Sequence, residues 1–367
     1  MMWSLSLLSS VLFLHRSLAL APTYSDSIFS PYIVEKYDRI GAAYKAASYP
    51  HLTMSNGSWI WQEADRWTSG FLPGSFYLLE ERKGLCPNNE ALNSVDWLTY
   101  GRHWRGECTR ARPGVPGHSV LRGTQNWGDS NPTNVSAIAG VKNFAVLLAN
   151  RYNGIVGCTR SWDSDGPEFH VIVDNMMNLE RMQLLFKAAD LSGNQTLIDM
   201  AISHANKTIA NHVRPDGSSY QVVVYNENTG AIIRYYTNQG YAEDSTWTRD
   251  RSYRSSLGYI WIRQNDFDAP TPNRPADTSA ATIAAEGLFI LAEAESGNVT
   301  GEDYYKEQGV KLLVHNFKFA LQPTWDSILS NGTSNARRNN TNTGLVYGDY
   351  YAIQAGNTML KLGLASC

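Results

Sequence analysis

Residues 279–294 read SAATIAAEGLFILAEA, and their apolar side chains recur at spacings of three and four residues. This period places the apolar side chains on one face of an α-helix, and Ala, Leu and Glu are strong helix formers. The same pattern returns along most of the chain and predicts a mainly helical fold. The other runs with this period are 137–152, 175–191, 196–213, 304–321 and 351–365.

One stretch departs from the helical pattern. Residues 220–235, YQVVVYNENTGAIIRY, contain two β-branched runs around an Asn/Gly turn, which predicts a β-hairpin. Strands and helices do not alternate, so a Rossmann fold or a TIM barrel is disfavoured. We expect one domain over 22–367, built of repeated helical hairpins. If the hairpins close into a ring, their loops gather at one end, where loops on a rigid scaffold can carry a site.

Composition narrows the class of protein. The chain has 367 residues, of which 43% are apolar, which is enough for one sizeable core or two small ones. Its net charge is −3, and no basic stripe argues for nucleic acid. The 11 Trp and 20 Tyr residues offer flat rings that suit stacking on sugar faces, although such rings also fill ordinary cores.

The N-terminus indicates the compartment. MMWSLSLLSSVLFL (1–14) is apolar but too short to span a bilayer, and Ala19-Leu20-Ala21 has the small-residue spacing of a cleavage site. We therefore expect a signal peptide over 1–21 and a secreted protein; the alternative is a buried first helix. Seven Asn-X-Ser/Thr sequons support secretion and indicate a glycoprotein. They begin at Asn56, Asn134, Asn194, Asn206, Asn298, Asn331 and Asn339.

The four cysteines are Cys86, Cys108, Cys158 and Cys367. They show no C-x-x-C spacing, so a structural zinc site is not expected. In an oxidising compartment Cys86 and Cys108 are candidates for a local disulfide, although spacing alone does not decide the pairing.

Seven segments, taken in order, resemble the unsaturated glucuronyl hydrolases of glycoside hydrolase family 88, and the secreted fungal members most of all. They span nearly the whole mature chain, so the match is specific. They are WTSGFLPG (67–74), CTRSWD (158–163), VIVDNMMNL (171–179), RPDGS (214–218), QGYAEDSTWTR (239–249), residues 275–288 and YGDYY (347–351).

The resemblance implies an all-α fold, the (α/α)6 barrel, in which six helical hairpins form a ring. It also implies a reaction on oligosaccharides left by polysaccharide lyases, which carry an unsaturated uronic acid at the non-reducing end. A proton is delivered to C4 of the C4=C5 double bond and water adds at C5, after which the hemiketal opens and releases the next sugar. No metal or organic cofactor is implied. The expected partners are these oligosaccharides, with no nucleic acid and no membrane.

Asp174 matches the general acid/base of the family, in VIVDNMMNL. A carboxyl group beside apolar neighbours is disfavoured in its charged form, which suits a group that must donate a proton near neutral pH. The alternative is a helix N-cap, because Asp is a good cap for the NMMNLE run that follows. That geometry would instead favour the carboxylate.

The resemblance also assigns substrate-binding residues. Arg249 would pair with the substrate carboxylate, Trp247 would stack on the sugar ring and Gln239 would hydrogen-bond its hydroxyls. Trp67 and Phe71 match aromatic residues at the pocket of the family. Read alone, the aromatic residues are as well explained by core packing and Arg249 by a surface ion pair.

Other matching positions are expected to be structural. Asp277 would begin a helix, and 347–351 would support the fold. His204 and His212 are spaced by eight residues on a helical run, which fits no metal motif.

Three departures from the family are visible. The family has a second aspartate in an H-D-x-G-F motif, but the corresponding stretch here, GHSVLRG (117–123), has Ser119 after His118, and the downstream Asp129 does not match the motif. The family often has His after D-G-S, where this chain has Gln221, a candidate sugar ligand that can donate a hydrogen bond but not a proton. After Arg249 comes DRSY, with Tyr253 at a Trp position, and roughly one helical hairpin is missing.

These departures leave more than one hypothesis open. The leading one is a secreted glycoside hydrolase acting on unsaturated uronides. The second is a catalytically impaired relative that binds uronides without turning them over. The third is the related unsaturated rhamnogalacturonyl hydrolase type. The stretch 105–122 is basic and rich in Pro and Gly, and we expect it to be unlike a barrel helix. Abrupt composition changes near 105–125 and 250–265 also suggest an incomplete or mis-spliced gene model.

Overall fold

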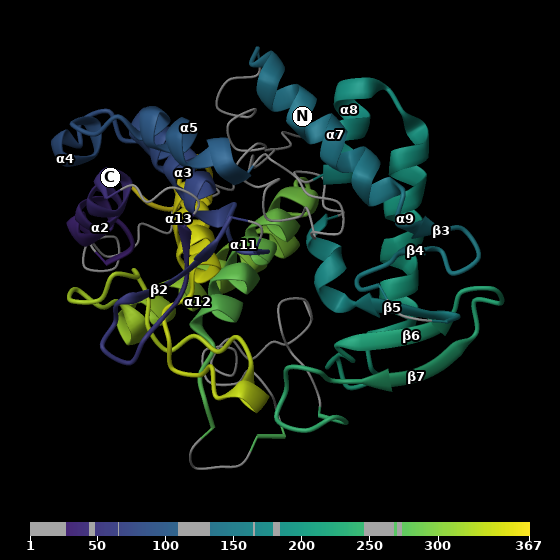
Figure 1. The fold of residues 1–367 in the computed structure, drawn as a ribbon. Helices are drawn as coiled ribbons and strands as arrows, with labels where there is room; N and C mark the ends of the chain where they lie inside the picture. Colours follow the sequence, from purple (N-terminus) through teal and green to yellow (C-terminus); the bar gives the residue numbers. More distant parts are fainter. Residues whose placement is uncertain are drawn as a thin grey trace, which may run out of the picture.

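The arrangement of the chain is seen in a computed structural model (Figure 1). The structure describes residues 27–43, 48–64, 66–108, 133–163, 166–178, 184–245, 268–269 and 274–367.

Helices dominate, as predicted, and five of the six predicted runs coincide with helices to within a few residues at most ends. The sixth, 175–191, is wrong in its first part. Residues Val173–Asn178 form a 3-10 helix, η1, and α8 is described from Leu184. The α-helices are α2 Pro31–Ala42, α3 Phe71–Leu85, α4 Glu90–Asn93, α5 Trp97–Cys108, α7 Val135–Ala149, α8 Leu184–Ser192, α9 Gln195–Asn211, α11 Thr278–Ala294, α12 Val299–Ala320 and α13 Val346–Lys361.

The helices pack on their sequence neighbours as hairpins. α11 packs on α12, and α8 packs on both α7 and α9. α13 packs on both α11 and α3, so the C-terminal helix lies against one helix from the first quarter of the chain and one from the last third (Figure 1). Side-chain caps begin these helices: Asn134 accepts from the backbone N of Ala137, and Asn194 accepts from the backbone N of Thr196. Such caps satisfy N–H groups that a helix leaves unpaired at its start.

The predicted hairpin is present and belongs to a three-stranded antiparallel sheet. It consists of β6 (Val222–Asn226) and β7 (Ile232–Tyr236), and β5 (Glu168–Ile172) pairs on the other side of β6 (Figure 1). The central strand β6 has four of its five residues buried, which explains its continuous run of Val and Tyr. Ile172 pairs with Val222, so the end of β5 lies beside the start of β6.

Two further hairpins were not predicted. β1 (Ser48–Thr53) pairs with β2 (Trp59–Glu63), and the two-residue strands β3 (Tyr152–Asn153) and β4 (Cys158–Thr159) pair with each other. The two-residue strands carry too few alternations to be recognised from sequence, whereas β1 and β2 are at least as long as β6 and β7 and were missed.

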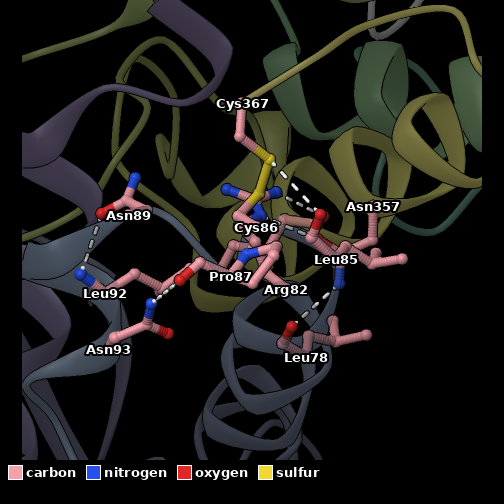
Figure 2. Close-up of a disulfide and its surroundings, with 11 residues drawn as sticks. Leu78, Arg82, Leu85, Cys86, Pro87, Asn89, Leu92, Asn93, Asn357 and Cys367 are labelled. Carbon is pink, nitrogen blue, oxygen red and sulfur yellow. Dashed lines mark hydrogen bonds between the residues drawn. A yellow bond between two sulfur atoms is a disulfide. The ribbon is translucent and has the colours of Figure 1, made fainter.

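A disulfide joins Cys86, at the end of α3, to Cys367, at the C-terminus of the chain, with a Cα–Cα distance of 5.6 Å (Figure 2). The suggested Cys86–Cys108 pair is therefore wrong. The close packing of α13 on α3 brings together cysteines that are 281 residues apart in the sequence, and no local spacing reveals this. Beneath the disulfide, Arg82 donates from Nε to Oδ1 of Asn357 at 2.7 Å and from Nη2 to the carbonyl of Ile353 at 2.7 Å.

α13 also carries a buried charge, Asp349. Its Oδ2 and Oδ1 accept hydrogen bonds from the backbone N–H groups of Ile328 and Leu329 at 2.8 and 3.1 Å. Burial is the main cause that raises the pKa of Asp349, and burial lowers the pKa of the nearby Lys36. Lys36 Nζ donates to the carbonyls of Gln322 and Ser327. These contacts support the structural role expected for 347–351.

Several expectations lie outside the described residues. They are the signal peptide at 1–21, the motif region from 109 onward with Ser119 and Asp129, and the stretch 250–265 with its missing hairpin. Residues 105–108, which we expected to be unlike a barrel helix, are the last turn of α5. Within the described chain, no helix has the length and apolar character needed to cross a membrane.

Candidate active site

Asp174 lies where the sheet meets the helices. It follows the last residues of β5 and is the second residue of η1, so a 3-10 turn stands where we had considered an α-helix N-cap. The side chain is half-buried. Its Oδ2 is buried and has no hydrogen-bond partner in the described part of the chain. The described residues therefore leave this carboxylate oxygen unpaired.

Asn175, the next residue, is anchored in the protein interior. It is 5% exposed, and its Nδ2 donates to the carbonyl oxygen of Thr159 at 3.0 Å. Thr159 lies on β4, and its backbone N–H donates to Nδ1 of His204 on α9 at 3.1 Å. The contact of Asn175 with Thr159 ties the 3-10 turn to β4. The same contact fixes the turn that carries Asp174.

Gln221 joins two segments of the site. Its backbone carbonyl accepts from the N–H of Val173, the neighbour of Asp174, at 2.8 Å. Its side chain is fully buried, and Oε1 accepts from the backbone N–H groups of Asn238 and Gln239 at 2.6 and 3.0 Å. The structure thus places two predicted site residues, Gln221 and Gln239, in direct contact. It also bonds Gln221 to Val173, the residue that precedes Asp174.

Gln239 lies in a compact loop over residues 237–245. The loop is closed by the hydrogen bond from Thr237 N to the carbonyl of Glu243, and Thr237 Oγ1 donates to the carbonyl of Ser245 at 2.9 Å. The carbonyl of Gln239 accepts from the N–H of Ala336 at 3.0 Å, which brings the loop before α13 to the same place. Trp247 and Arg249, the other expected ligands from this segment, lie outside the described residues.

Arg214 also holds this loop, a role that sequence reasoning missed. Its Nη2 donates to the carbonyl of Ser245 at 3.0 Å, and its guanidinium lies 4.0 Å from the ring centre of Tyr220. Arg214 begins the RPDGS turn, in which Gly217 has a φ of +85°, a left-handed conformation that favours glycine. The RPDGS match could have drawn attention to Arg214, but only the fold shows what it contacts.

Charged groups tie β5 to β7. Arg234 donates to both carboxylate oxygens of Glu168, with Nη2 to Oε2 at 2.9 Å, and Nε2 of His170 lies 3.0 Å from Oε2. The hydrogen bonds from Arg234, and then from His170, lower the pKa of Glu168 to about 2. This bridge crosses the central strand of the sheet that ends at Asp174.

Trp67 and Phe71 form a separate aromatic cluster. Their ring centres lie 6.4 Å apart, and both contact Tyr347, at 5.3 and 5.9 Å. Phe71 is 5% exposed and also meets Tyr350, so core packing accounts for its position. Trp67 is half-buried and retains a partly accessible face. The contacts described here join these two rings to α13 rather than to the Gln221–Gln239 pair.

The residues expected to be structural behave as such. Asp277 caps α11, with Oδ1 accepting from the backbone N–H groups of Ser279 and Ala280, which confirms it as a helix-start residue. His204 and His212 are fully buried, and His212 Nδ1 lies 3.0 Å from the carbonyl of Tyr220. Among the described residues, no group of three or more His, Cys, Asp and Glu side chains is arranged to hold a metal ion.

The chain is similar to known unsaturated glucuronyl hydrolases in both sequence and structure. An unsaturated glucuronyl hydrolase of Formosa agariphila is 30% identical over 325 residues, which cover 79% of this chain and 78% of the relative. A crystal structure of an unsaturated glucuronyl hydrolase specific for heparin superposes with a TM-score of 0.79 at 22% identity, over 94% of this chain and 98% of that chain.

A third match is a mutant of the unsaturated glucuronyl hydrolase from Streptococcus agalactiae complexed with dGlcA-GalNAc6S. Its TM-score is 0.67 at 18% identity, over 92% of this chain and 91% of that chain. A scan against models of protein families finds no match. The structural likeness confirms the expected fold, a six-hairpin α/α toroid.

Proposed function

Because the chain belongs to the family of unsaturated glucuronyl hydrolases, we propose that it hydrates the C4=C5 double bond of an unsaturated uronic acid at the non-reducing end of lyase-generated oligosaccharides. The observation that carries the proposal is the setting of Asp174. Its turn is held on one side by Gln221 and on the other by Thr159, and its Oδ2 has no partner among the described residues.

In the proposed mechanism Asp174 acts as general acid and then as general base. Its proton goes to C4 of the vinyl ether while water adds at C5 and gives up a proton to the resulting carboxylate. The hemiketal so formed opens as the C5–O5 bond breaks, which gives a ketone at C5 and a hemiacetal at C1. The hemiacetal then collapses to an aldehyde, and the next sugar leaves with a proton on its oxygen. One carboxyl group suffices because the proton goes to a ring carbon; the usual pair of carboxylates flanks a glycosidic oxygen.

We assign the sugar contacts to Gln239 and Trp67, with Phe71 behind Trp67, and to Trp247 and Arg249. The loop that leads to Trp247 is anchored at Ser245 by Arg214 and Thr237. An Arg in that position suits the uronate, since guanidinium and carboxylate form two parallel hydrogen bonds. The complex of a relative with dGlcA-GalNAc6S supports a uronide as the ligand class.

We also assign the protein to the secretory pathway, as a glycoprotein with a cleaved leader at 1–21. The Cys86–Cys367 disulfide supports this, because disulfides persist in oxidising compartments. Several sequon residues are exposed, including Asn206 on α9.

A competing function is uronide binding without turnover, which is favoured by one observation: the family's H-D-x-G-F aspartate has no counterpart at Ser119. The substrate double bond absorbs in the ultraviolet, and hydration removes this absorbance. We expect the absorbance of a lyase-generated disaccharide to fall in step with release of its second sugar. Unchanged absorbance together with a raised melting temperature would favour the binding function, and sugar release with the absorbance kept would identify ordinary glycosidic hydrolysis.

A further inference from the structure

Gln221 has a contact pattern that a sugar ligand alone would not need. Its side-chain oxygen faces two backbone N–H groups, those of Asn238 and Gln239. Both are obligate donors, so the atom that faces them must be the amide oxygen, and the orientation of the amide is fixed. The amide nitrogen Nε2 is then buried without a hydrogen-bond partner in the described part of the chain.

This orientation has an energetic consequence. A buried donor without a partner destabilises a protein by about 1–3 kcal/mol, so such groups are rare and call for an explanation. An apolar residue at position 221 would avoid the unpaired donor but would leave the two loop N–H groups without an acceptor. The useful part of the amide is therefore its oxygen, which accepts from both loop N–H groups.

The backbone and the side chain of Gln221 contact different segments of the site. The backbone carbonyl holds Val173, next to the proton donor, and the side-chain oxygen holds Gln239, in the loop that leads to the sugar ligands. Gln239 is held in turn by Ala336, from the loop before α13. Thus one residue links the turn of Asp174 to the loop of Gln239 by three hydrogen bonds.

We propose that Gln221 is a positioning residue that sets the distance between the sugar-binding loop and the carboxyl group of Asp174. This rests on the proposed function and goes beyond it, because Gln221 acts on the sugar through the backbone of 238 and 239. A misplacement of about 1 Å between reacting groups is enough to reduce turnover by about 10²-fold, so a loosened loop should lower kcat.

The test compares two substitutions of nearly the same size. Gln221→Met removes the acceptor, whereas Gln221→Glu keeps it and removes the unpaired N–H groups. Amide hydrogen exchange of the protein without sugar should be about tenfold faster at Asn238 and Gln239 in Q221M and near wild type in Q221E. The N–H of Val173 is an internal control, since its acceptor is the backbone carbonyl of Gln221 and survives both substitutions.

Kinetics with a lyase-generated unsaturated disaccharide provides the second readout. We expect kcat to fall about 10–100-fold in Q221M and to stay within threefold of wild type in Q221E, whose added charge raises KM for the anionic sugar. Gln354→Met is the matched control: Gln354 is a partly buried glutamine whose Nε2 donates to Glu286 Oε1 at 3.1 Å, between α13 and α11. It should leave kcat unchanged.

Two results would overturn the proposal. One is protection of Asn238 and Gln239 in Q221M equal to that in wild type; the other is an equal loss of kcat in Q221M and Q221E. The exchange measurement needs no turnover, so it decides the positioning role even for a protein that binds uronides without hydrating them.

Discussion

Asn175 donates a hydrogen bond from its side-chain amide to the backbone carbonyl of Thr159 at 3.0 Å, and this contact joins the turn of Asp174 to a strand from a different part of the chain. Thr159 is itself fully buried and donates to His204 on α9. The turn is thus fixed to the helical scaffold by interior contacts rather than by solvent-exposed ones. A proton donor needs such support because its reach to one substrate atom must be reproducible.

Asn175→Ala should therefore lower kcat more than it changes KM. We expect a loss of kcat of about tenfold and a loss of stability of about 1–2 kcal/mol, because the carbonyl of Thr159 loses its partner. Asn211→Ala is the control: Asn211 Nδ2 donates to the hydroxyl of Tyr225 at 2.9 Å on the far part of α9. If both variants lose stability to the same extent and kcat is unaffected in each, the contact is structural only.

Arg214→Lys should raise KM while preserving the net charge. Lysine lacks the planar fork that reaches the carbonyl of Ser245 and stacks on Tyr220, so the loop that leads to Trp247 and Arg249 should loosen. We expect KM for an unsaturated disaccharide to rise by about fivefold to tenfold, in line with one lost charge-assisted hydrogen bond.

The comparison for this variant is Arg234→Lys, which alters an arginine that lies 5.9 Å from the ring of Tyr236 on exposed β7. KM should stay near wild type in that variant. An equal rise in KM in the two variants would show that the effect does not depend on the contacts of Arg214 with Ser245 and Tyr220.

Removal of the Cys86–Cys367 disulfide should destabilise the whole fold. The bridge closes a loop with a sequence separation of 281 residues, and loss of a native disulfide lowers the free energy of unfolding by about 2–5 kcal/mol. Urea denaturation of Cys86→Ser, Cys367→Ser and the double variant should give three similar losses. A reducing agent should destabilise wild type and leave the double variant unchanged; if wild type is insensitive to reduction, this pairing is wrong.

The Glu168 bridge predicts a dependence of stability on pH. Its folded pKa, about 2, lies below the ordinary value of 4.5, so the charged form is the stabilised one. The contribution is present above pH 4.5 and is lost as the pH falls through about 2. The melting temperature of wild type should exceed that of Glu168→Gln at pH 6, and the difference should shrink toward pH 2. A difference that is constant from pH 6 to pH 2 would contradict the assignment.

Much of this fold could be predicted from periodicity. The run at 279–294 is α11 to within one residue at its start, and the capping role of Asp277 follows from its position before that run. The β6–β7 hairpin was predicted from its β-branched residues and its turn. These features are local, and local patterns carry enough information to place them.

The rest depends on contacts between distant segments. The turn at Val173–Asn178 is tied to Thr159 by the side chain of Asn175, and Cys86 pairs with Cys367 because α13 lies on α3. In the site, the resemblance marked Gln221 and Gln239 separately. Only the fold shows that the side chain of one holds the backbone of the other.

The central claim is that Asp174 supplies the proton that starts hydration of the double bond. The most direct measurement is the ultraviolet absorbance of a lyase-generated unsaturated disaccharide incubated with wild type and with Asp174→Asn at equal folded concentration. General acid catalysis contributes about 10²–10⁴-fold, so the rate should fall by at least that range, with an unchanged melting temperature. Loss of absorbance at the wild-type rate in Asp174→Asn would contradict the account.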